Sequence, residues 1–211
     1  MSRFNRKDSI NLLSKITPRR AWNGMKVLSS YYISKWTKRP VQWGYPVSIS
    51  FEPTTGMLQR DFFSETIDQL SKDLLYLVFY FQGEPYLNPS FLDMVKYAAK
   101  KKIYTATSTN AHYLNDENAK RTIESGLDRL IISIDGTTQD VYQQYRVGGH
   151  LHKVIEGAKN IVKWKKELKS SKPFVIFQFL VVKPNEHQIE DVKKLGKEIG
   201  VDDIWFKTAQ V

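Results

Sequence analysis

Residues 79–89 are FYFQGEPYLNP, and they join the end of an apolar run to the beginning of a helical stretch. The apolar run from Tyr76 to Phe81 predicts a buried strand, which stops at a glycine, a carboxylate and a proline. Gly83 permits a ligand to approach the backbone, and Pro85 fixes the turn. In a parallel α/β barrel the functional residues lie at the carboxyl ends of the strands. We therefore expect Glu84 to project its charge into the mouth of such a barrel.

From about Pro46 onward, the chain repeats this order of a short β-rich run followed by an amphipathic helical stretch. Apolar residues at spacings of three and four, such as Phe63, Ile67 and Leu70, predict the helices. The sequence therefore predicts an α/β fold, a partial (β/α)6 TIM-like barrel with parallel strands. Because the chain stops just past the sixth strand, we expect an open barrel, a sequence that ends early, or both. The other predicted strands are residues 47–51, 103–107, 130–134, 174–182 and 204–206.

Residues 1–44 differ from the predicted barrel domain, residues 45–211, and predict a basic, amphipathic helical extension. A helix of this kind can lie on a membrane surface. More often it packs on its own domain or on a neighbour, and we adopt that interpretation, with peripheral membrane contact through residues 19–38 as the alternative. The apolar residues that recur at helical spacing after Pro18 are Trp22, Met25, Leu28, Tyr32 and Trp36.

Composition narrows the classes of protein to which the chain can belong. Its 211 residues are 41% hydrophobic and 26% charged, which is typical of a soluble domain. No apolar run approaches the roughly 20 residues of a membrane-spanning helix, and no signal peptide is evident, so we expect a cytoplasmic location. The net charge is +10, but the lysines between Lys163 and Lys172 lack an interleaved aromatic signature. We interpret them as a solvated helix face and expect no nucleic-acid partner.

Cysteine is absent from the sequence. This excludes disulfides, thiol catalysis and a thiolate-bound metal in the chain as given. The four histidines do not suggest a histidine-rich metal site. His150 and His152 are two residues apart, a spacing that suits a strand better than one helix face, and we interpret both as surface residues.

Polar residues follow successive predicted strands at the point where each strand ends. Several have ordinary explanations: Asn110 and Gly136 suit turns, and Asp135 would cap a helix. Their recurrence at the same end of successive strands nevertheless predicts a site at the barrel mouth. The segments are Glu52-Pro53-Thr54, Gly83-Glu84-Pro85, Ser108-Thr109-Asn110, Ser133 to Gly136, Gln178, and Tyr145-Arg146-Val147-Gly148-Gly149.

In this order these segments resemble the radical S-adenosylmethionine (radical SAM) enzymes, particularly their SPASM-type branch. The resemblance runs from about Val47 to Val211 and rests on five segments that match in sequence and spacing. It implies a partial (β/α)6 barrel that uses S-adenosylmethionine and a 4Fe–4S cluster to begin radical chemistry. It also implies a small-molecule or peptide substrate of unknown identity and an electron donor such as flavodoxin or ferredoxin.

The resemblance further implies which residues bind the cofactor. The Gly-Glu-Pro motif would receive the amino group of the methionine part, a suitable task for a carboxylate beside backbone carbonyls. Arg146 would pair with the cofactor carboxylate. The strand-three residues would contact the ribose or the methionine end. The strand-four residues would lie near the ribose, and the strand-five glutamine would line the cavity. These residues are Gly83, Glu84, Pro85, Ser108, Asn110, Ser133, Asp135, Arg146 and Gln178.

The chain departs from the family at one point. Family members carry a CxxxCxxC loop after the first strand, whose thiolates hold the cluster. Here Thr54-Thr55 runs directly into Gly56-Met57, and no hydroxyl or carboxylate replaces soft thiolates. As written, the chain is expected to bind no cluster and to be inactive. The loop is either missing from the sequence given, deleted, or lost naturally in a pseudoenzyme; the intact cofactor segments favour the first two.

Besides nucleic-acid binding through the lysine-rich helix, which we do not favour, two other functions remain as alternatives. One is a cluster-free binding module that uses the barrel mouth for a nucleotide-like ligand. The other is a hydrolase with Glu52, Glu84 and Asp135 as paired carboxylates. Two of these carboxylates directly precede prolines in turn-like segments, which disfavours the hydrolase.

Overall fold

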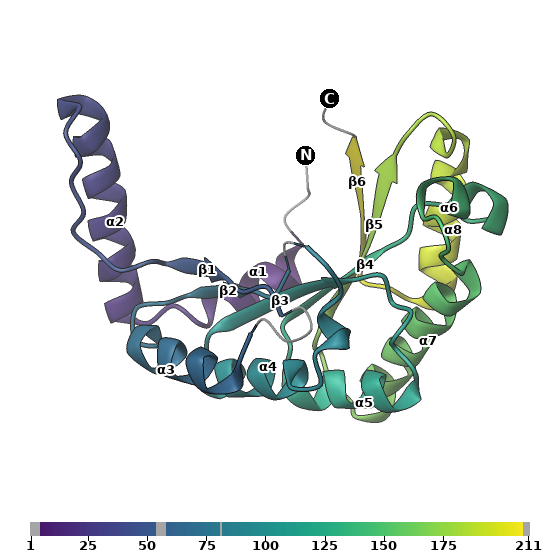
Figure 1. Cartoon of the computed structure of the whole chain (residues 1–211), viewed down its shortest axis with the longest axis horizontal. Helices are drawn as coiled ribbons and strands as arrows, with labels where there is room; N and C mark the ends of the chain where they lie inside the picture. Colours follow the sequence, from purple (N-terminus) through teal and green to yellow (C-terminus); the bar gives the residue numbers. More distant parts are fainter. Residues whose placement is uncertain (1–4, 54–57, 81, 209–211) are drawn as a thin grey trace.

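The computed structural model describes residues 5–53, 58–80 and 82–208. Within these residues six strands form a single parallel sheet whose order in space follows their order in the chain, with β1 and β6 at its two edges (Figure 1). This arrangement confirms the predicted α/β fold. The strands are β1 (Ser48–Ser50), β2 (Tyr76–Val78), β3 (Tyr104–Thr109), β4 (Arg129–Ser133), β5 (Phe174–Val181) and β6 (Asp203–Thr208).

Helices follow the strands and cover the outer, convex side of the curved sheet (Figure 1). This placement is what right-handed β–α–β connections produce in a parallel sheet. They are α3 (Arg60–Leu70), α4 (Phe91–Lys100), α5 (Asp116–Ser125), α6 (Gln139–Tyr145), α7 (Leu151–Glu167) and α8 (Ile189–Ile199), with short 3₁₀ helices η1 (Pro85–Leu87) and η2 (Glu186–Gln188).

Both faces of the sheet are buried along β5. Val175, Phe177 and Phe179 belong to the main core beneath the helices, whereas Phe174 and Ile176 join a smaller cluster on the opposite, concave face. Side chains alternate between the two faces of a strand, so a strand buried on both sides needs a continuous apolar run. This is why β5 carries such a run in the sequence.

The observed strands differ in length from the predicted ones. β3 continues to Thr109, two residues beyond the predicted end, while β2 stops at Val78. The extension matters because it carries polar residues of β3 up to the loop that contains Glu84. Phe81, which we predicted as the end of the second strand, and Thr54 lie outside the described residues.

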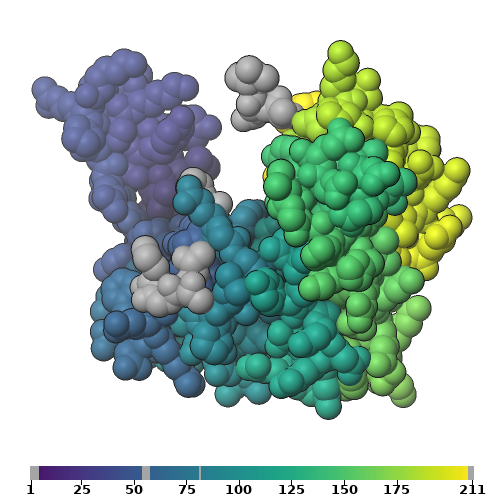
Figure 2. Space-filling view, turned by 45° about the vertical axis from the view of Figure 1, so that its right-hand side comes forward, coloured from purple at the N-terminus to yellow at the C-terminus, as the bar shows by residue number. Residues whose placement is uncertain are grey.

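The amino-terminal segment forms α1 (Arg6–Leu13) and α2 (Pro18–Thr37). Thr17 caps α2 by accepting a hydrogen bond from the amide of Arg20, and Pro18 occupies its first turn. The base of α2 is anchored to the barrel, but the rest of it stands away from the curved sheet as a separate lobe (Figures 1 and 2). Helical structure in this segment agrees with the sequence, and a domain boundary near residue 44 stays a prediction.

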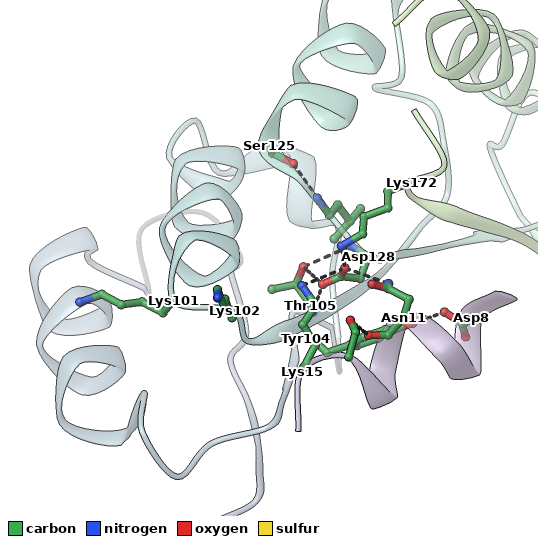
Figure 3. A network of polar contacts seen from close by, with 12 residues as sticks. Asp8, Asn11, Lys15, Lys101, Lys102, Tyr104, Thr105, Ser125, Asp128 and Lys172 are labelled. Carbon is green, nitrogen blue, oxygen red and sulfur yellow. Dashed lines mark hydrogen bonds and ion pairs between the residues drawn. The ribbon is translucent and has the colours of Figure 1, made fainter. Parts of the chain in front are cut away.

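Helix α1 lies against the amino-terminal ends of the strands. Asp8 accepts hydrogen bonds from the Tyr104 hydroxyl and from the Arg129 guanidinium, whose Nε lies 3.0 Å from its Oδ2. A second carboxylate, Asp128, is fully buried and forms ion pairs with Lys15, which lies just after α1, and with Lys172 (Figure 3). These contacts hold α1 across the end of the sheet opposite the predicted site.

Candidate functional site

A polar cavity of about 180 Å³ lies at the carboxyl-terminal edge of the sheet. Strand ends β2, β3 and β4 all contribute to it, because the carboxyl ends of parallel strands share one edge. The cavity is smaller than the roughly 300–1,000 Å³ typical of small-molecule pockets, so it has room for a group of amino-acid size. Its lining residues are Tyr80, Gln82, Gly83, Glu84, Ser108, Thr109, Asn110, Ser133 and Arg146.

Glu84 is the buried acid of this cavity, with 5% of its surface exposed. Its two carboxylate oxygens accept hydrogen bonds from the Thr109 hydroxyl at 2.8 Å, the Asn110 amide at 2.8 Å and the Tyr86 amide at 3.3 Å. Burial raises the pKa of Glu84, and these three hydrogen bonds oppose the rise without cancelling it. The carboxylate is thus held in a place where its negative charge is poorly solvated and where a cation would be stabilised.

The local sequence explains how Glu84 reaches this position. Gly83 adopts φ +75°, a left-handed conformation that favours glycine, and it turns the chain after β2. Pro85 then begins η1, and Glu84 caps that short helix through its bond to the Tyr86 amide. Tyr86 is itself tied to α5 by a hydrogen bond of 2.8 Å to the Thr122 hydroxyl.

Arg146 supplies the positive charge of the cavity. Its Nε donates to Asp135 Oδ2 at 2.6 Å. The second oxygen of Asp135 accepts from the Leu180 amide at 3.0 Å, and Asn185 donates to the Asp135 backbone carbonyl. Asp135 therefore fixes Arg146 to the ends of β4 and β5. Among the described residues none accepts a hydrogen bond from the terminal guanidinium nitrogens of Arg146, so these nitrogens are available to a ligand.

The structure brings together six of the nine predicted site residues and leaves three outside the cavity lining. Pro85 is buried at the start of η1, and Asp135 acts through Arg146 instead of capping a helix. Gln178 pairs in register with Ser133, and its position in β5 places it on the concave face with Ile176. The six residues that line the cavity are Gly83, Glu84, Ser108, Asn110, Ser133 and Arg146.

The paired-carboxylate hydrolase is not supported by this geometry. Glu84 is the one acidic residue among those lining the cavity. Asp135 is in an ion pair, and Glu52 accepts a hydrogen bond from the Gln82 amide at 2.5 Å. A cavity with one carboxylate and one guanidinium instead complements a zwitterion, because an amino acid presents an ammonium and a carboxylate together.

His112 is a residue of this region that the sequence did not single out. Its Nδ1 contacts the Asn110 carbonyl at 3.0 Å, and its Nε2 accepts the His150 amide at 2.9 Å, so the ring is neutral with the proton on Nδ1. The ring thereby joins the end of β3 to the loop that follows Arg146. His150 and His152 are exposed, as predicted, but they lie immediately before and within the first turn of α7, not in a strand.

Acid is expected to weaken the link through His112. Burial lowers the pKa of His112, with Lys153, His150 and His152 adding to the effect. A depressed pKa means that its contribution to stability is present above about pH 6.5 and is lost as the pH falls through the folded value. We expect the free energy of unfolding, measured in urea, to fall by about 1 kcal/mol more between pH 7.5 and 5 in the native chain than in His112→Gln. The control is the exposed His187→Gln, and an identical pH response in all three chains would contradict the prediction.

No donor set for an iron–sulfur cluster is present. The chain has no cysteine, and within residues 5–53, 58–80 and 82–208 no group of three or more histidine, aspartate or glutamate side chains is placed to hold a metal ion. Iron–sulfur clusters need thiolates, so the residues present do not fit this group. The junction between Thr54 and Met57, where the family carries its cysteines, lies outside the described residues.

The chain belongs to the radical SAM superfamily, whose family model matches residues 48–196. Members of this superfamily use S-adenosylmethionine together with a 4Fe–4S cluster. The matched segment contains every residue of the cavity described above.

Individual proteins of known sequence or structure resemble this chain. A tungsten-containing aldehyde ferredoxin oxidoreductase cofactor-modifying protein from Pyrococcus furiosus is 30% identical over 158 residues, covering 72% of this chain and 43% of the relative. Streptococcus suis SuiB bound to S-adenosylmethionine has the same fold, with a TM-score of 0.65 at 14% identity, covering 86% of this chain and 45% of SuiB. SuiB bound to its precursor peptide SuiA gives 0.64 at 14% identity, with 85% and 43% covered. The chain thus spans less than half the length of these proteins.

Proposed function

We propose that this chain is the S-adenosylmethionine-binding core of a radical SAM enzyme and that it holds the methionyl end of the cofactor in the polar cavity. The observation that carries the proposal is the pairing of one buried carboxylate, Glu84, with one guanidinium, Arg146, in a cavity of amino-acid size. Glu84 would accept hydrogen bonds from the cofactor ammonium, and the terminal nitrogens of Arg146 would donate to its carboxylate.

The remaining polar residues suit the other parts of the cofactor. Ser108 and Ser133 lie on β3 and β4 at the cavity and would bind hydroxyl groups of the ribose. Gln178, on the concave face beyond the cavity, would line the path of the nucleoside. The larger part of the cofactor would extend over this concave face, because the cavity itself is too small to enclose it.

When bound beside a cluster, S-adenosylmethionine supplies a 5′-deoxyadenosyl radical. We propose that this step belongs to a parent enzyme, meaning a form of this protein that carries the cysteine loop. The chain as given offers no thiolate, so we propose that it binds the cofactor without cleaving it. A SPASM-type extension and a flavodoxin or ferredoxin as electron donor belong to the same proposed parent. The proposed substrate is a small molecule or a peptide; SuiB, which shares the fold, binds a precursor peptide.

Calorimetry with three ligands tests the proposal. Without coordination to iron, S-adenosylmethionine should bind weakly, with a Kd of about 0.1–1 mM. S-adenosylhomocysteine should bind comparably because it keeps the amino-acid end, whereas 5′-methylthioadenosine, which lacks that end, should bind at least about 10-fold more weakly. Arg146→Met should reduce the difference between the ligands, because the carboxylate loses its partner while Glu84 still binds the ammonium. Equal binding of 5′-methylthioadenosine and S-adenosylmethionine, or no heat from a folded chain, would contradict the proposal.

Anaerobic treatment with iron and sulfide provides a separate check on the cluster. The chain should retain no stoichiometric iron after gel filtration, because it has no soft ligands. Retained iron and sulfide in a fixed ratio would show that the part of the proposal concerning the cluster is wrong, whatever the calorimetry shows.

A further inference from the structure

Helix α2 exposes a continuous apolar face. Trp22 is 61% exposed, Met25 53%, Tyr32 58% and Trp36 84%. Their spacing of three, seven and four residues places them on one side of the helix. Trp43 and Tyr45, in the segment that returns toward β1, are also more than half exposed. Among the described residues nothing covers this face, and α2 forms a lobe that stands apart from the rest of the chain (Figure 2).

The opposite face of α2 carries polar residues whose contacts hold the helix to the returning segment. Asn23 is fully buried, donating to the Tyr45 carbonyl at 3.0 Å and accepting from the Tyr45 amide at 2.9 Å. Ser34 exchanges hydrogen bonds with the backbone of Val41 in the same way. An amphipathic helix that packed on its own barrel would bury its apolar side. In α2 the specific hydrogen bonds instead turn that side outward.

The base of α2 is rigidly attached to the barrel. The Arg20 guanidinium donates to four backbone carbonyls, including those of Ser71 at 2.8 Å and Lys102 at 2.6 Å. Arg19 makes two hydrogen bonds to the carboxylate of Asp73. The orientation of the apolar face is therefore a fixed property of the fold and does not depend on a loose terminal segment.

The charge of the residues around the apolar face indicates which kind of partner would bind there. The sequence contains no aspartate or glutamate between Asp8 and Glu52, a stretch that carries seven lysines and arginines. At about 100° per residue, Lys26 and Lys35 fall on opposite flanks of the apolar face. Two copies of α2 meeting face to face would bring like charges together, which is unfavourable. An anionic surface would be attracted along the whole lobe.

We propose that α2 docks on an anionic lipid surface, with its apolar face among the acyl chains and its lysines among the headgroups. Tryptophan and tyrosine are the side chains that prefer the membrane–water boundary, and lysine stems reach from apolar surroundings to charged headgroups. No described helix is long and apolar enough to cross a bilayer. The docking proposed is that of an amphipathic helix lying in the membrane interface. This proposal assigns residues 19–38 to peripheral membrane contact and not to packing on the domain.

Vesicle co-sedimentation of the whole chain tests this docking. Vesicles of phosphatidylcholine with one-third phosphatidylglycerol should sediment the protein at low salt, and the tryptophan emission should shift to shorter wavelength. Trp22→Ser with Trp36→Ser should reduce the partition coefficient at least about 10-fold. Lys26→Glu with Lys35→Glu should reduce it by a similar factor and should abolish its salt dependence. The matched control is Lys159→Glu with Lys166→Glu, which makes the same charge change on the exposed face of α7 and should leave binding nearly unchanged.

Three outcomes would overturn the docking proposal. The first is absence of sedimentation by a chain whose circular dichroism shows it folded. The second is equal loss of binding in the α7 control, which would mean that net charge alone is responsible. The third is a dimer in light scattering that the tryptophan double variant abolishes, which would assign the face to a second copy. Cofactor calorimetry is independent of all three, so the docking and the proposed function succeed or fail separately.

Discussion

Replacing Glu84 with glutamine is expected to weaken cofactor binding without destabilising the fold. S-adenosylmethionine affinity should fall at least about 10-fold, because the cofactor ammonium would lose a charged acceptor in a poorly solvated site. The free energy of unfolding at pH 7 should stay within about 1 kcal/mol of the native value or rise. The reason is that burial raises the pKa of Glu84, so its ionised form is costly to the folded state.

The sign of the pH dependence follows from the same shift. A raised pKa means that the contribution of Glu84 to stability is fully present below its unfolded value and is lost as the pH rises through the folded value. The free energy of unfolding of Glu84→Gln should therefore increase relative to that of the native chain as the pH rises from 4 to 7. Urea unfolding in the absence of ligand measures this difference. The control is Glu156→Gln, an exposed residue of α7. A strong loss of stability in Glu84→Gln with unchanged cofactor affinity would make Glu84 a structural residue and contradict the prediction.

Asp128→Asn is expected to lower the free energy of unfolding by about 3–5 kcal/mol, the cost of removing one partner from a buried ion pair. The Asp128 carboxylate binds the ammonium groups of Lys15 and Lys172 and accepts from the Asn11 amide at 2.9 Å and the Thr105 backbone amide at 3.0 Å (Figure 3). Asparagine would leave two neighbouring lysines without their counter-ion. Burial already lowers the pKa of Lys15 despite the nearby carboxylate, so its charge depends on that partner.

A double variant distinguishes loss of this ion pair from a general loss of stability in the core. Lys15→Met together with Asp128→Asn should recover about 1–2 kcal/mol relative to Asp128→Asn alone, because the stranded cation is then absent. Asp191→Asn, at an exposed position of α8, should change stability by less than about 0.5 kcal/mol. Urea unfolding measures these chains together with Lys15→Met alone, which completes the double-mutant cycle. Additive losses from the two substitutions would contradict the coupling that the structure indicates.

Much of the barrel was predictable from the sequence because local patterns decide it. The apolar runs and helical spacings identify all six strands, and their order along the chain implies a parallel sheet. Boundaries were less accurate: the prediction ended the third strand at Thr107, whereas β3 continues to Thr109. The polar residues Ser108 and Thr109 show no periodic pattern that would mark them as part of a strand. Their pairing with the neighbouring strand β4 is what extends β3 to Thr109.

The sequence by itself determined the family, the missing thiolates and the polar residues at successive strand ends, because residue type and spacing are sufficient for each. Only the tertiary structure decided how those residues divide their tasks. Asp135 lies close to Arg146 through the meeting of two loops, and His112 joins the end of β3 to the loop after Arg146. The outward direction of the apolar face of α2 was likewise set by hydrogen bonds to a returning segment. These contacts join residues between 7 and 38 positions apart and lie on different segments of the chain, so neither composition nor periodicity records them.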